Sequence, residues 1–351
     1  MLTHIKLENF RSHLRAEFDL GEVTVFLGAN GAGKSNVLEA ITLLAFCKSF
    51  REEDKKSLIH FDADYARIVA GEMEIFIQKS PTSIFKAKNK GLFSKKVDFI
   101  GLLPTVVFSP ETLSIIAGGP KERRRFLDVM IGQVDREYLL TLINFEKVKE
   151  QRNSLLQKLA KGQGAASELD YWDTKFLEYA RLIIAKRQEV ISSLNQSLSN
   201  FYSEISGDAD QELQLNYTTT LTPEIIDDIH SIRAREIASG RSQFGPHRDD
   251  FKVVLNSRNM ANYASRGEVR SAILSLKITE ICFLEKSLKN TDKKPILLLD
   301  DIFSEFDEDR RHHLDKLIEG YQTIITTTDE IFLSPTLRQK AVVIRLERNS
   351  E

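Results

Sequence analysis

One segment constrains this chain more than any other: Gly28-Ala29-Asn30-Gly31-Ala32-Gly33-Lys34-Ser35. It matches the whole Walker A pattern, in which a glycine-rich loop ends in Gly-Lys-Ser or Gly-Lys-Thr. The apolar run Val23–Leu27 precedes the segment and is typical of a strand buried on both faces. Residues 36–47 follow it with helical spacing of their apolar positions. A strand, a glycine loop and a helix in this order predict a phosphate-binding loop in an α/β fold.

The residue types of this loop suit a nucleotide. Glycines permit backbone angles that turn amide N–H groups toward phosphate oxygens. Lys34 is placed to reach the β- and γ-phosphates of ATP, and the Ser35 hydroxyl is placed to ligate Mg²⁺. The loop residues that we expect to bind the nucleotide are Gly28, Ala29, Asn30, Gly31, Ala32, Gly33, Lys34, Ser35 and Asn36.

A second apolar strand ends in two carboxylates. Ile296–Leu299 leads into Asp300 and Asp301. By themselves, two acids after a strand are typical of a solvated loop, but the Walker A match favours a catalytic interpretation. We expect Asp300 to share the Mg²⁺ ion with Ser35, and Asp301 to orient or deprotonate an attacking water. The predicted catalytic residues are Lys34, Asp300 and Asp301.

A third motif lies about 35 residues before the acidic pair. Ser265-Arg266-Gly267-Glu268 opens a helix whose apolar positions run from Leu274 to Leu288. The amino end of a helix attracts anions, so that Ser265 and Gly267 are candidate phosphate contacts. An ordinary helix cap is the simpler interpretation, and the position just before the acidic strand favours the phosphate contact.

The middle of the chain is helical. Val134–Leu159 and Leu169–Phe201 are long, helix-like and free of proline, with a turn signal at Lys161–Ala165. The pattern fits two antiparallel helices that form an arm, or equally two core helices of a bundle. We predict residues 1–118 as the N-terminal part of an ATPase lobe, 119–240 as a helical second lobe, and 241–351 as the C-terminal part of the ATPase lobe.

The composition indicates a reduced protein of the cytoplasm. The sequence has no run long and apolar enough for a transmembrane helix, and its first ten residues do not form a signal peptide. The two cysteines, Cys47 and Cys282, have no metal-type spacing. The net charge of −2 speaks against a strongly basic nucleic-acid binder, but it conceals an uneven distribution. Residues 1–125 hold 19 Lys and Arg against 15 Asp and Glu, a net of +4, which leaves −6 for the remainder.

Two basic clusters lie in the positive part. Residues 79–96 contain six lysines and no acid, and they fit either a DNA-facing surface or a solvated hairpin. Aromatic residues are sparse there, so that base stacking is not expected. Arg123, Arg124 and Arg125 follow a Gly-Gly-Pro helix start, where the helix dipole disfavours cations. Their acidic partner is either DNA or a carboxylate such as Asp128.

Several stretches together resemble a known group, the ABC-type ATPase heads that include the structural-maintenance-of-chromosomes proteins. Within it the chain is most similar to the RecF family of bacterial recombination mediators. The motifs that carry the resemblance are Asn9-Phe10-Arg11-Ser12, the Walker A segment, Ser49-Phe50-Arg51, Phe108-Ser109-Pro110-Glu111, Gly118-Gly119-Pro120-Lys121-Glu122-Arg123-Arg124-Arg125, Gln151-Arg152-Asn153, Gly245-Pro246-His247-Arg248-Asp249-Asp250-Phe251, Ser-x-Gly at 265–267, and Leu299-Asp300-Asp301-Ile302-Phe303-Ser304-Glu305-Phe306-Asp307.

The resemblance implies a head with a mostly helical second lobe that bears a short antiparallel helical arm. It implies that Arg11 approaches the nucleotide, and that Ser265 and Gly267 contact ATP held by a second subunit. It further implies an ATP-dependent homodimer that binds double-stranded and gapped DNA, cooperates with RecR and RecO, and helps to load RecA. The expected activity is a weak, DNA-stimulated ATPase of DNA repair, replication and the SOS response, located in the cytoplasm at the nucleoid and not at a membrane.

Three departures from the family pattern bear on hydrolysis. Glu268 stands where the signature usually has Gln, and an extra carboxylate near phosphate needs a partner such as Arg266 or Arg270. Residues 104–108 lack the expected glutamine, and residues 326–329 lack the switch histidine. The rival functions are a transporter's nucleotide-binding subunit and a divergent ATPase of a defence assembly. The long helical insertion argues against the first rival, and no added metal-type carboxylate cluster or appended domain supports the second.

Overall fold

The computed structural model describes residues 1–51, 55–79 and 84–347. The chain divides into two compact units. The first unit comprises Met1–Leu113, Glu204–Gly207 and Arg266–Glu351. The second comprises Ser114–Ser203 and Asp208–Ser265. Each unit is described by itself below.

A five-stranded parallel sheet forms the centre of the first unit. Its strands, in spatial order, are β14 (Val342–Arg345), β3 (Val23–Leu27), β13 (Thr323–Thr327), β12 (Ile296–Asp300) and β8 (Thr105–Phe108). The strands β3, β13 and β12 are buried along their whole length, as their unbroken apolar or threonine-rich sequences predict. Because all five strands run in one direction, their carboxyl ends meet at a single edge.

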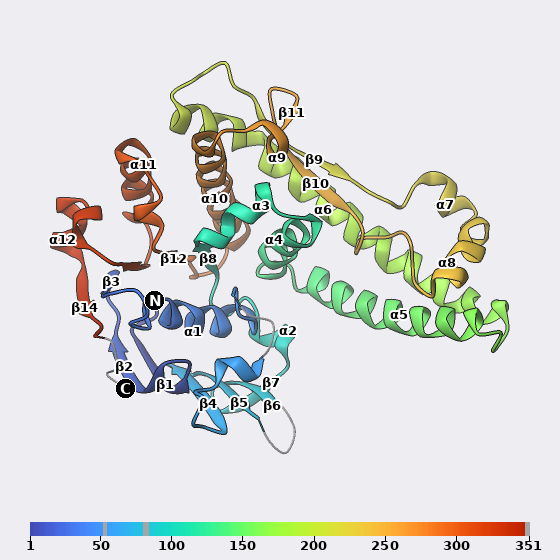
Figure 1. The fold of residues 1–351 in the computed structure, drawn as a ribbon, viewed down its shortest axis with the longest axis horizontal. Helices are drawn as coiled ribbons and strands as arrows, with labels where there is room; N and C mark the ends of the chain where they lie inside the picture. The colour runs from blue at the N-terminus through green and yellow to red at the C-terminus, as the bar shows by residue number, and fades with distance from the viewer. Residues whose placement is uncertain (52–54, 80–83, 348–351) are drawn as a thin grey trace. The chain divides into compact units, whose positions relative to one another are not determined.

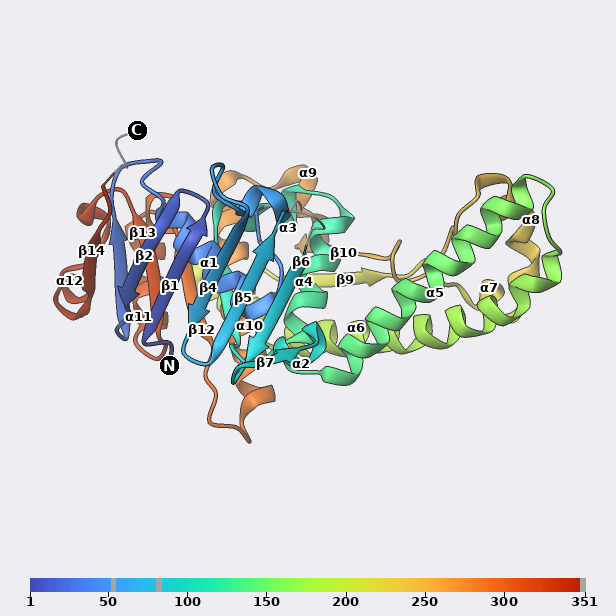
Figure 2. The ribbon, with the colours of Figure 1, turned by 90° about the horizontal axis from the view of Figure 1, so that it is seen from below.

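A six-stranded antiparallel sheet forms a second layer of this unit. Its strands, in spatial order, are β2 (His13–Asp19), β1 (His4–Phe10), β4 (Tyr65–Ala70), β5 (Met73–Gln78), β6 (Ile84–Asn89) and β7 (Leu92–Ser94). Figures 1 and 2 show this sheet as the blue and cyan strands beside α1. Its strands alternate buried and exposed side chains, because only one face is covered.

Helix α1 (Lys34–Phe46) lies between the two sheets and joins their cores. Its apolar side chains pack in one cluster with residues of both sheets, including Leu7 of β1, Ile75 of β5 and Leu298 of β12. Because a helix between two sheets is enclosed, α1 is buried on nearly every side. Its first residue follows the glycine loop directly, so that the core fixes where the loop lies.

The remaining elements of the first unit are helical and cover its edges. They are η1 (Lys55–Leu58), α2 (Lys96–Phe99), η2 (Pro110–Leu113), α10 (Arg266–Leu288), η5 (Ile302–Ser304), α11 (Glu308–Ile318), η6 (Glu330–Phe332) and α12 (Pro335–Lys340). Helix α10 begins at the Ser-x-Gly motif as predicted, and packs against β8. Its burial extends well beyond one apolar stripe, because polar residues such as Ser271 and Glu280 are buried too.

The second unit is built on two long helices, α5 (Arg136–Ala160) and α6 (Leu169–Ser206). Phe145 contacts Phe176, and Arg152 pairs with Asp173. Because residues later in α5 meet residues earlier in α6, the two helices run antiparallel (Figure 2). The other helical elements are α3 (Ser114–Ala117), α4 (Pro120–Gly132), η3 (Ala166–Glu168), α7 (Pro223–Asp227), η4 (Ile229–Ile232), α8 (Arg233–Ser239) and α9 (Met260–Tyr263).

A small antiparallel sheet completes the second unit. It consists of β9 (Leu213–Thr218), β10 (Asp250–Leu255) and β11 (Arg258–Asn259), with β10 in the middle. The sequence assigns residues 241–265 to the ATPase lobe and 114–118 to its N-terminal part, but both stretches cluster with the second unit. Residues 241–265 belong to the second unit because the six residues of β10 pair with β9, beginning with Asp250 opposite Thr218.

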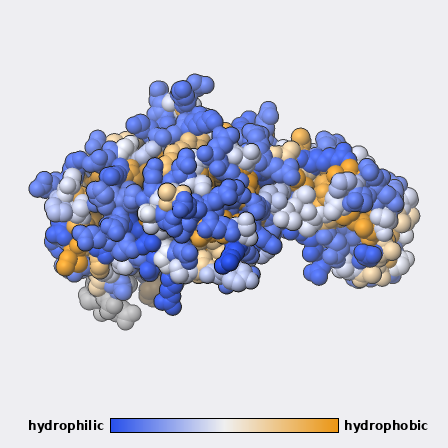
Figure 3. All heavy atoms as spheres, turned by 90° about the horizontal axis from the view of Figure 1, so that it is seen from above, coloured by the Kyte–Doolittle hydropathy of each residue, from blue (hydrophilic) through white to orange (hydrophobic). Residues whose placement is uncertain are grey.

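Among the described residues, no helix combines the length and apolar character that crossing a membrane requires. The molecular face in Figure 3 is largely hydrophilic, with apolar side chains in small separate areas.

Candidate nucleotide-binding site

The glycine loop lies between β3 and α1, at the carboxyl edge of the parallel sheet. Gly31 and Gly33 have φ angles of 87° and 89°, in the left-handed region that glycine adopts without strain. A Cβ atom on Gly33 would lie 2.7 Å from the Ser12 hydroxyl, and one on Gly28 would lie 2.3 Å from the Leu346 carbonyl oxygen. Gly33 is therefore required both by its backbone conformation and by its close neighbours, Gly31 by its conformation, and Gly28 by a close neighbour.

Lys34 and Ser35 begin α1 and point to different partners. The Lys34 ammonium donates to the carbonyl oxygens of Gly28 at 2.7 Å and Ala29 at 3.0 Å. Burial lowers the pKa of Lys34, while the nearby Asp301 and Asp300 oppose this shift. The Ser35 hydroxyl donates to Asp300 at 2.6 Å. The helix has no side-chain cap at Gly33, so that its amino end presents N–H groups, as an anion site requires.

Asp300 ends β12, the strand two positions from β3, and Asp301 follows it directly. Asp300 also accepts a hydrogen bond from Thr326 at 2.7 Å, so that β13 helps to position this carboxylate. The Thr326 hydroxyl also accepts a hydrogen bond from the Asp301 backbone N–H at 3.0 Å. A serine hydroxyl and a carboxylate in contact form a donor set of the type that Mg²⁺ takes in phosphoryl-transfer sites.

Asp301 differs from Asp300 in conformation and environment. Its φ of 51° is left-handed, which is uncommon for a residue other than glycine. Its Oδ1 atom is buried, and among the described residues it has no hydrogen-bond partner. Burial raises the pKa of Asp301, Lys34 opposes the shift, and Asp300 and Glu305 add to it. A strained, incompletely satisfied carboxylate beside a phosphate loop can accept a hydrogen bond from a water.

The turn between β1 and β2 supports the loop from the antiparallel sheet. Its residue Arg11 has a φ of 52° and forms a two-pronged ion pair with Glu39 of α1, with N–O distances of 2.9 and 2.8 Å. A ring nitrogen of His13 lies 3.1 Å from the Gly33 carbonyl oxygen, and the Asn36 amide donates to the Ser12 hydroxyl at 2.9 Å. The turn thus contacts both the loop and α1.

The family resemblance implies that Arg11 approaches the nucleotide, whereas in this structure Arg11 pairs with Glu39, a residue not predicted from the sequence. Glu39 is wholly buried, accepts from Arg11, and also accepts a hydrogen bond from Ser49 of the Ser-Phe-Arg stretch. A charged residue one turn after Ser35, inside an otherwise apolar helix, is the signal that could have revealed it. His13 was missed too, and burial lowers its pKa.

The Ser-x-Gly residues are placed by α10. Ser265 is exposed immediately before the helix, and Gly267 lies in its first turn. The Gly267 carbonyl accepts a hydrogen bond from Arg310 of α11 at 3.2 Å. Arg270, one of the partners expected for Glu268, forms an ion pair with Glu305 at 2.6 Å. The predicted role of Ser265 and Gly267 toward a second subunit stays a prediction.

The triple arginine finds a carboxylate in the second unit. Arg123 forms a two-pronged ion pair with Asp250, with distances of 2.7 and 2.9 Å, and Arg124 donates to the Asp249 carbonyl oxygen at 2.7 Å. Asp128, the carboxylate that the sequence suggested, instead pairs with Arg187 of α6 at 2.8 Å. The partner lies 127 residues from Arg123, beyond the reach of local patterns.

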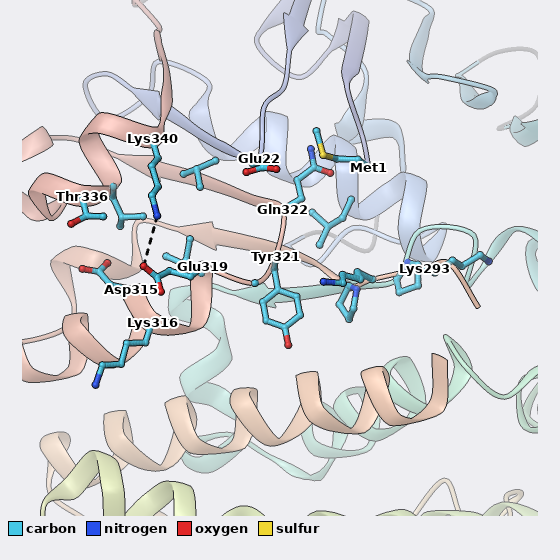
Figure 4. A pocket seen from close by; sticks show the side chains of 18 of the residues that line it. Met1, Glu22, Lys293, Asp315, Lys316, Glu319, Tyr321, Gln322, Thr336 and Lys340 are labelled. Carbon is cyan, nitrogen blue, oxygen red and sulfur yellow. Dashed lines mark ion pairs between the residues drawn. The ribbon is translucent and has the colours of Figure 1, made fainter. Parts of the chain in front are cut away.

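A cavity of about 1020 Å³ lies at the opposite edge of the parallel sheet. It is lined by Val23, Ile296 and Gln322, which lie at the amino ends of β3, β12 and β13. Figure 4 shows Gln322 together with Glu22 and Tyr321 in this lining. Lys340 and Glu319, which also line it, form an ion pair at 3.8 Å. The cavity is therefore separated by the length of the strands from the glycine loop, and it is not the nucleotide site.

The fold and the site together define an ABC-type P-loop ATPase head. A family model described as "AAA ATPase domain" matches residues 1–104. The head domain of an Smc protein from Pyrococcus furiosus has a similar fold, with a TM-score of 0.54 at 16% identity over 98% of this chain and 93% of that chain. The predicted α/β head with a mostly helical second part is confirmed.

The chain belongs to the RecF family of DNA replication and repair proteins. It is 34% identical to the RecF protein of Thermoanaerobacter pseudethanolicus, over 93% of this chain and 94% of that protein. Two solved structures of the recombination mediator RecF, one with ATPrS and one with ATP, have TM-scores of 0.87 and 0.85 at 30% and 32% identity to this chain. The first covers 100% of this chain and 98% of its own, and the second covers 94% of each. The chain is therefore a RecF-type ATPase of DNA replication and repair.

Proposed function

We propose that this chain is an ATP-controlled clamp on DNA. It binds Mg·ATP, dimerises around the nucleotide, holds double-stranded DNA near single-strand gaps, and releases the DNA after hydrolysis. The observation that carries this proposal is the meeting of the glycine loop with the acidic end of β12, where Ser35 donates to Asp300 in a chain of the RecF family. The other elements of the proposal depend on that site.

The chain's own residues divide the chemistry among them. Lys34 and the loop N–H groups hold the β- and γ-phosphates, with Lys34 exchanging its present carbonyl partners for phosphate oxygens. Ser35 and Asp300 hold the Mg²⁺ ion, which neutralises phosphate charge when bound. Asp301 orients the attacking water and accepts its proton, and its raised pKa brings this base nearer to neutral pH.

The second subunit completes the site in this proposal. Ser265 is exposed at the start of α10, where a partner's γ-phosphate can meet it together with Gly267. Arg11 is included among the nucleotide-binding residues because His13, in the same turn, contacts Gly33 of the loop. Glu268 adds a carboxylate near that phosphate, which favours slow hydrolysis that DNA stimulates.

The proposal extends to partners and place. The ATP-bound dimer recognises gapped duplex DNA and cooperates with RecR and RecO in loading RecA, in the cytoplasm at the nucleoid. The similar solved structures are of a recombination mediator protein in the RecFOR pathway. The net charge of −2 supports a conditional binder, because a single subunit has no overall excess of positive charge.

The test is DNA binding with and without nucleotide. Fluorescence anisotropy of a labelled gapped duplex is measured with ATP and Mg²⁺, with ADP, and without nucleotide, for the native chain and for Lys34→Ala. We expect ATP to raise affinity at least tenfold in the native chain and to have no effect in the variant. Sedimentation measured in parallel should show a dimer with ATP and a monomer with ADP or without nucleotide. Equal DNA affinity in all three nucleotide conditions would contradict the clamp.

A further inference from the structure

The outer face of the antiparallel sheet changes character from one end to the other. At the β1–β2 end, cations are neutralised: Lys6 pairs with Glu17 at 2.7 Å, and Arg15 approaches the same carboxylate at 3.6 Å. In the middle, Arg67 pairs with Glu74 at 3.0 Å. This part of the face is therefore a network of paired charges.

The β6–β7 end carries lysines and an exposed aromatic ring. Ala87 of β6 points into the core, so its neighbours Lys86 and Lys88 point outward on the other face. The register places Lys88 opposite Phe93 of β7. The Lys86 and Lys88 ammonium groups lie 5.1 and 5.0 Å from the centre of the Phe93 ring. We call Lys86, Lys88 and Phe93 the hairpin cluster.

The hairpin cluster is open to solvent and only partly neutralised. Phe93 is 66% exposed, and it lies on the edge strand of the sheet. Lys88 approaches Glu74 at 3.7 Å, but that carboxylate is already paired with Arg67. Within the described part of the chain, no ion pair to a carboxylate is found for Lys86. The cluster therefore places an exposed aromatic ring and two ammonium groups side by side on the surface.

We propose that the hairpin cluster binds DNA at the junction between double and single strand. Lys86 and Lys88 contact phosphates on either side of the junction, and Phe93 stacks on the first unpaired base. Phosphate contacts by lysine are independent of sequence, and an aromatic ring stacks on any base that is not already paired. The charge of the cluster is complementary to DNA, and its ring distinguishes a gap from an intact duplex. This inference rests on the proposed DNA-binding function.

The sequence offered no basis for stacking, because aromatic residues are sparse between 79 and 96. The hairpin brings Phe93 beside lysines that precede it by seven and five residues, so the cluster arises from strand pairing. Residues 80–83 of this stretch lie outside the described residues. A purely structural interpretation also exists: Lys86 and Lys88 lie on β6, next to the short edge strand β7, and cations near a sheet edge hinder pairing with other sheets.

The experiment compares three variants on two DNAs in the presence of ATP. The variants are Phe93→Ala, the matched control Leu92→Ala, and the double variant Lys86→Gln/Lys88→Gln. Leu92 is a neighbouring residue with 74% exposure, so it controls for the loss of exposed apolar surface. The DNAs are a gapped duplex and an intact duplex of equal length, and binding is measured by fluorescence anisotropy over a range of salt concentrations.

We expect Phe93→Ala to weaken binding to gapped DNA by about 5- to 150-fold, in line with stacking contributions of about 1–3 kcal/mol. Its affinity for the intact duplex should stay within about twofold of the native value. Phe93→Trp should restore the preference. The lysine double variant should bind both DNAs more weakly. The negative slope of log affinity against log salt should become shallower by about 1.8, because each lost phosphate contact contributes about 0.9. Leu92→Ala should match the native chain.

Two outcomes would overturn the inference while leaving the proposed function intact. In the first, Phe93→Ala and Leu92→Ala behave alike on gapped DNA, although the native chain binds it with ATP. In the second, the lysine variant keeps its salt slope but self-associates in gel filtration, which assigns the lysines to edge protection. A native chain that binds neither DNA with ATP would overturn the proposed function itself.

Discussion

The glycine-loop edge of the first unit and the paired long helices of the second unit both bury charged side chains, but they treat them differently. In the second unit, Arg152 is wholly buried and is bound on three sides. It donates to Asp173 at 2.7 Å, to Glu236 at 2.5 Å and to the Ser242 hydroxyl at 2.7 Å. Charge and hydrogen-bonding capacity are matched within the chain.

At the glycine-loop edge the match is incomplete. Lys34 is only 6% exposed, yet its hydrogen bonds reach two neutral carbonyl groups. Asp301 holds a buried oxygen with no hydrogen-bond partner in the described part of the chain, and burial raises its pKa. A buried polar atom without a hydrogen bond lowers the stability of the fold by about 1–3 kcal/mol. Such a group persists where a ligand will bind to it. The comparison separates charges that hold the fold from charges kept for chemistry.

The largest expected effect is on turnover. Asp301→Asn removes the base that accepts the water's proton, so ATP hydrolysis should fall by about 10²- to 10⁴-fold. The free energy of unfolding should not fall, because the buried carboxylate is disfavoured in its charged form. Phosphate release and urea denaturation measure the two quantities. Asp309→Asn, an exposed acid on α11, is the matched control, and full turnover in Asp301→Asn would remove it from the base position.

In the second unit we expect a loss of stability without a loss of ATP binding. Arg152→Leu leaves Asp173 and Glu236 buried without their cation, which should lower the free energy of unfolding by about 3–5 kcal/mol. ATP affinity of the folded protein should stay the same, because all these contacts lie within the second unit. The exposed Arg235→Leu is the control and should change stability by less than about 0.5 kcal/mol. A loss below about 1 kcal/mol in Arg152→Leu would show that the network is not structural.

A smaller effect should appear as a pH dependence of stability. The His247 ring packs near Phe145 and Phe176, and burial, with nearby Lys149 and Arg248, lowers its pKa to about 3. The unfolded chain takes up this proton near pH 6.5 and the folded chain does not, so stability is full above pH 6.5 and falls as the pH drops toward 3.

Between pH 7 and pH 5 the native chain should therefore lose about 2 kcal/mol more than His247→Gln, since each pH unit in this window contributes up to about 1.4 kcal/mol. Urea denaturation at the two pH values measures the difference. If both chains lose the same stability on acidification, His247 is not the group that responds.

Much of the site follows from local sequence patterns. The strand Val23–Leu27 has the bounds that its apolar run predicts, and α10 begins at the Ser-x-Gly motif. Glycines at 31 and 33 have the left-handed angles that the Walker A pattern requires. These features are readable because each depends on residues within a few positions of one another.

Partners distant in the chain could not be assigned in this way. Thr326 reaches Asp300 only because β13 lies beside β12, and Arg123 finds Asp250 across 127 residues. A buried apolar strand has the same pattern whichever strand lies beside it, so the pairing order is not written locally. The sequence by itself determined the phosphate loop, the acidic strand end and the family. Only the tertiary structure decided which charges are neutralised and which remain for a ligand, because that depends on neighbours brought together by the packed core.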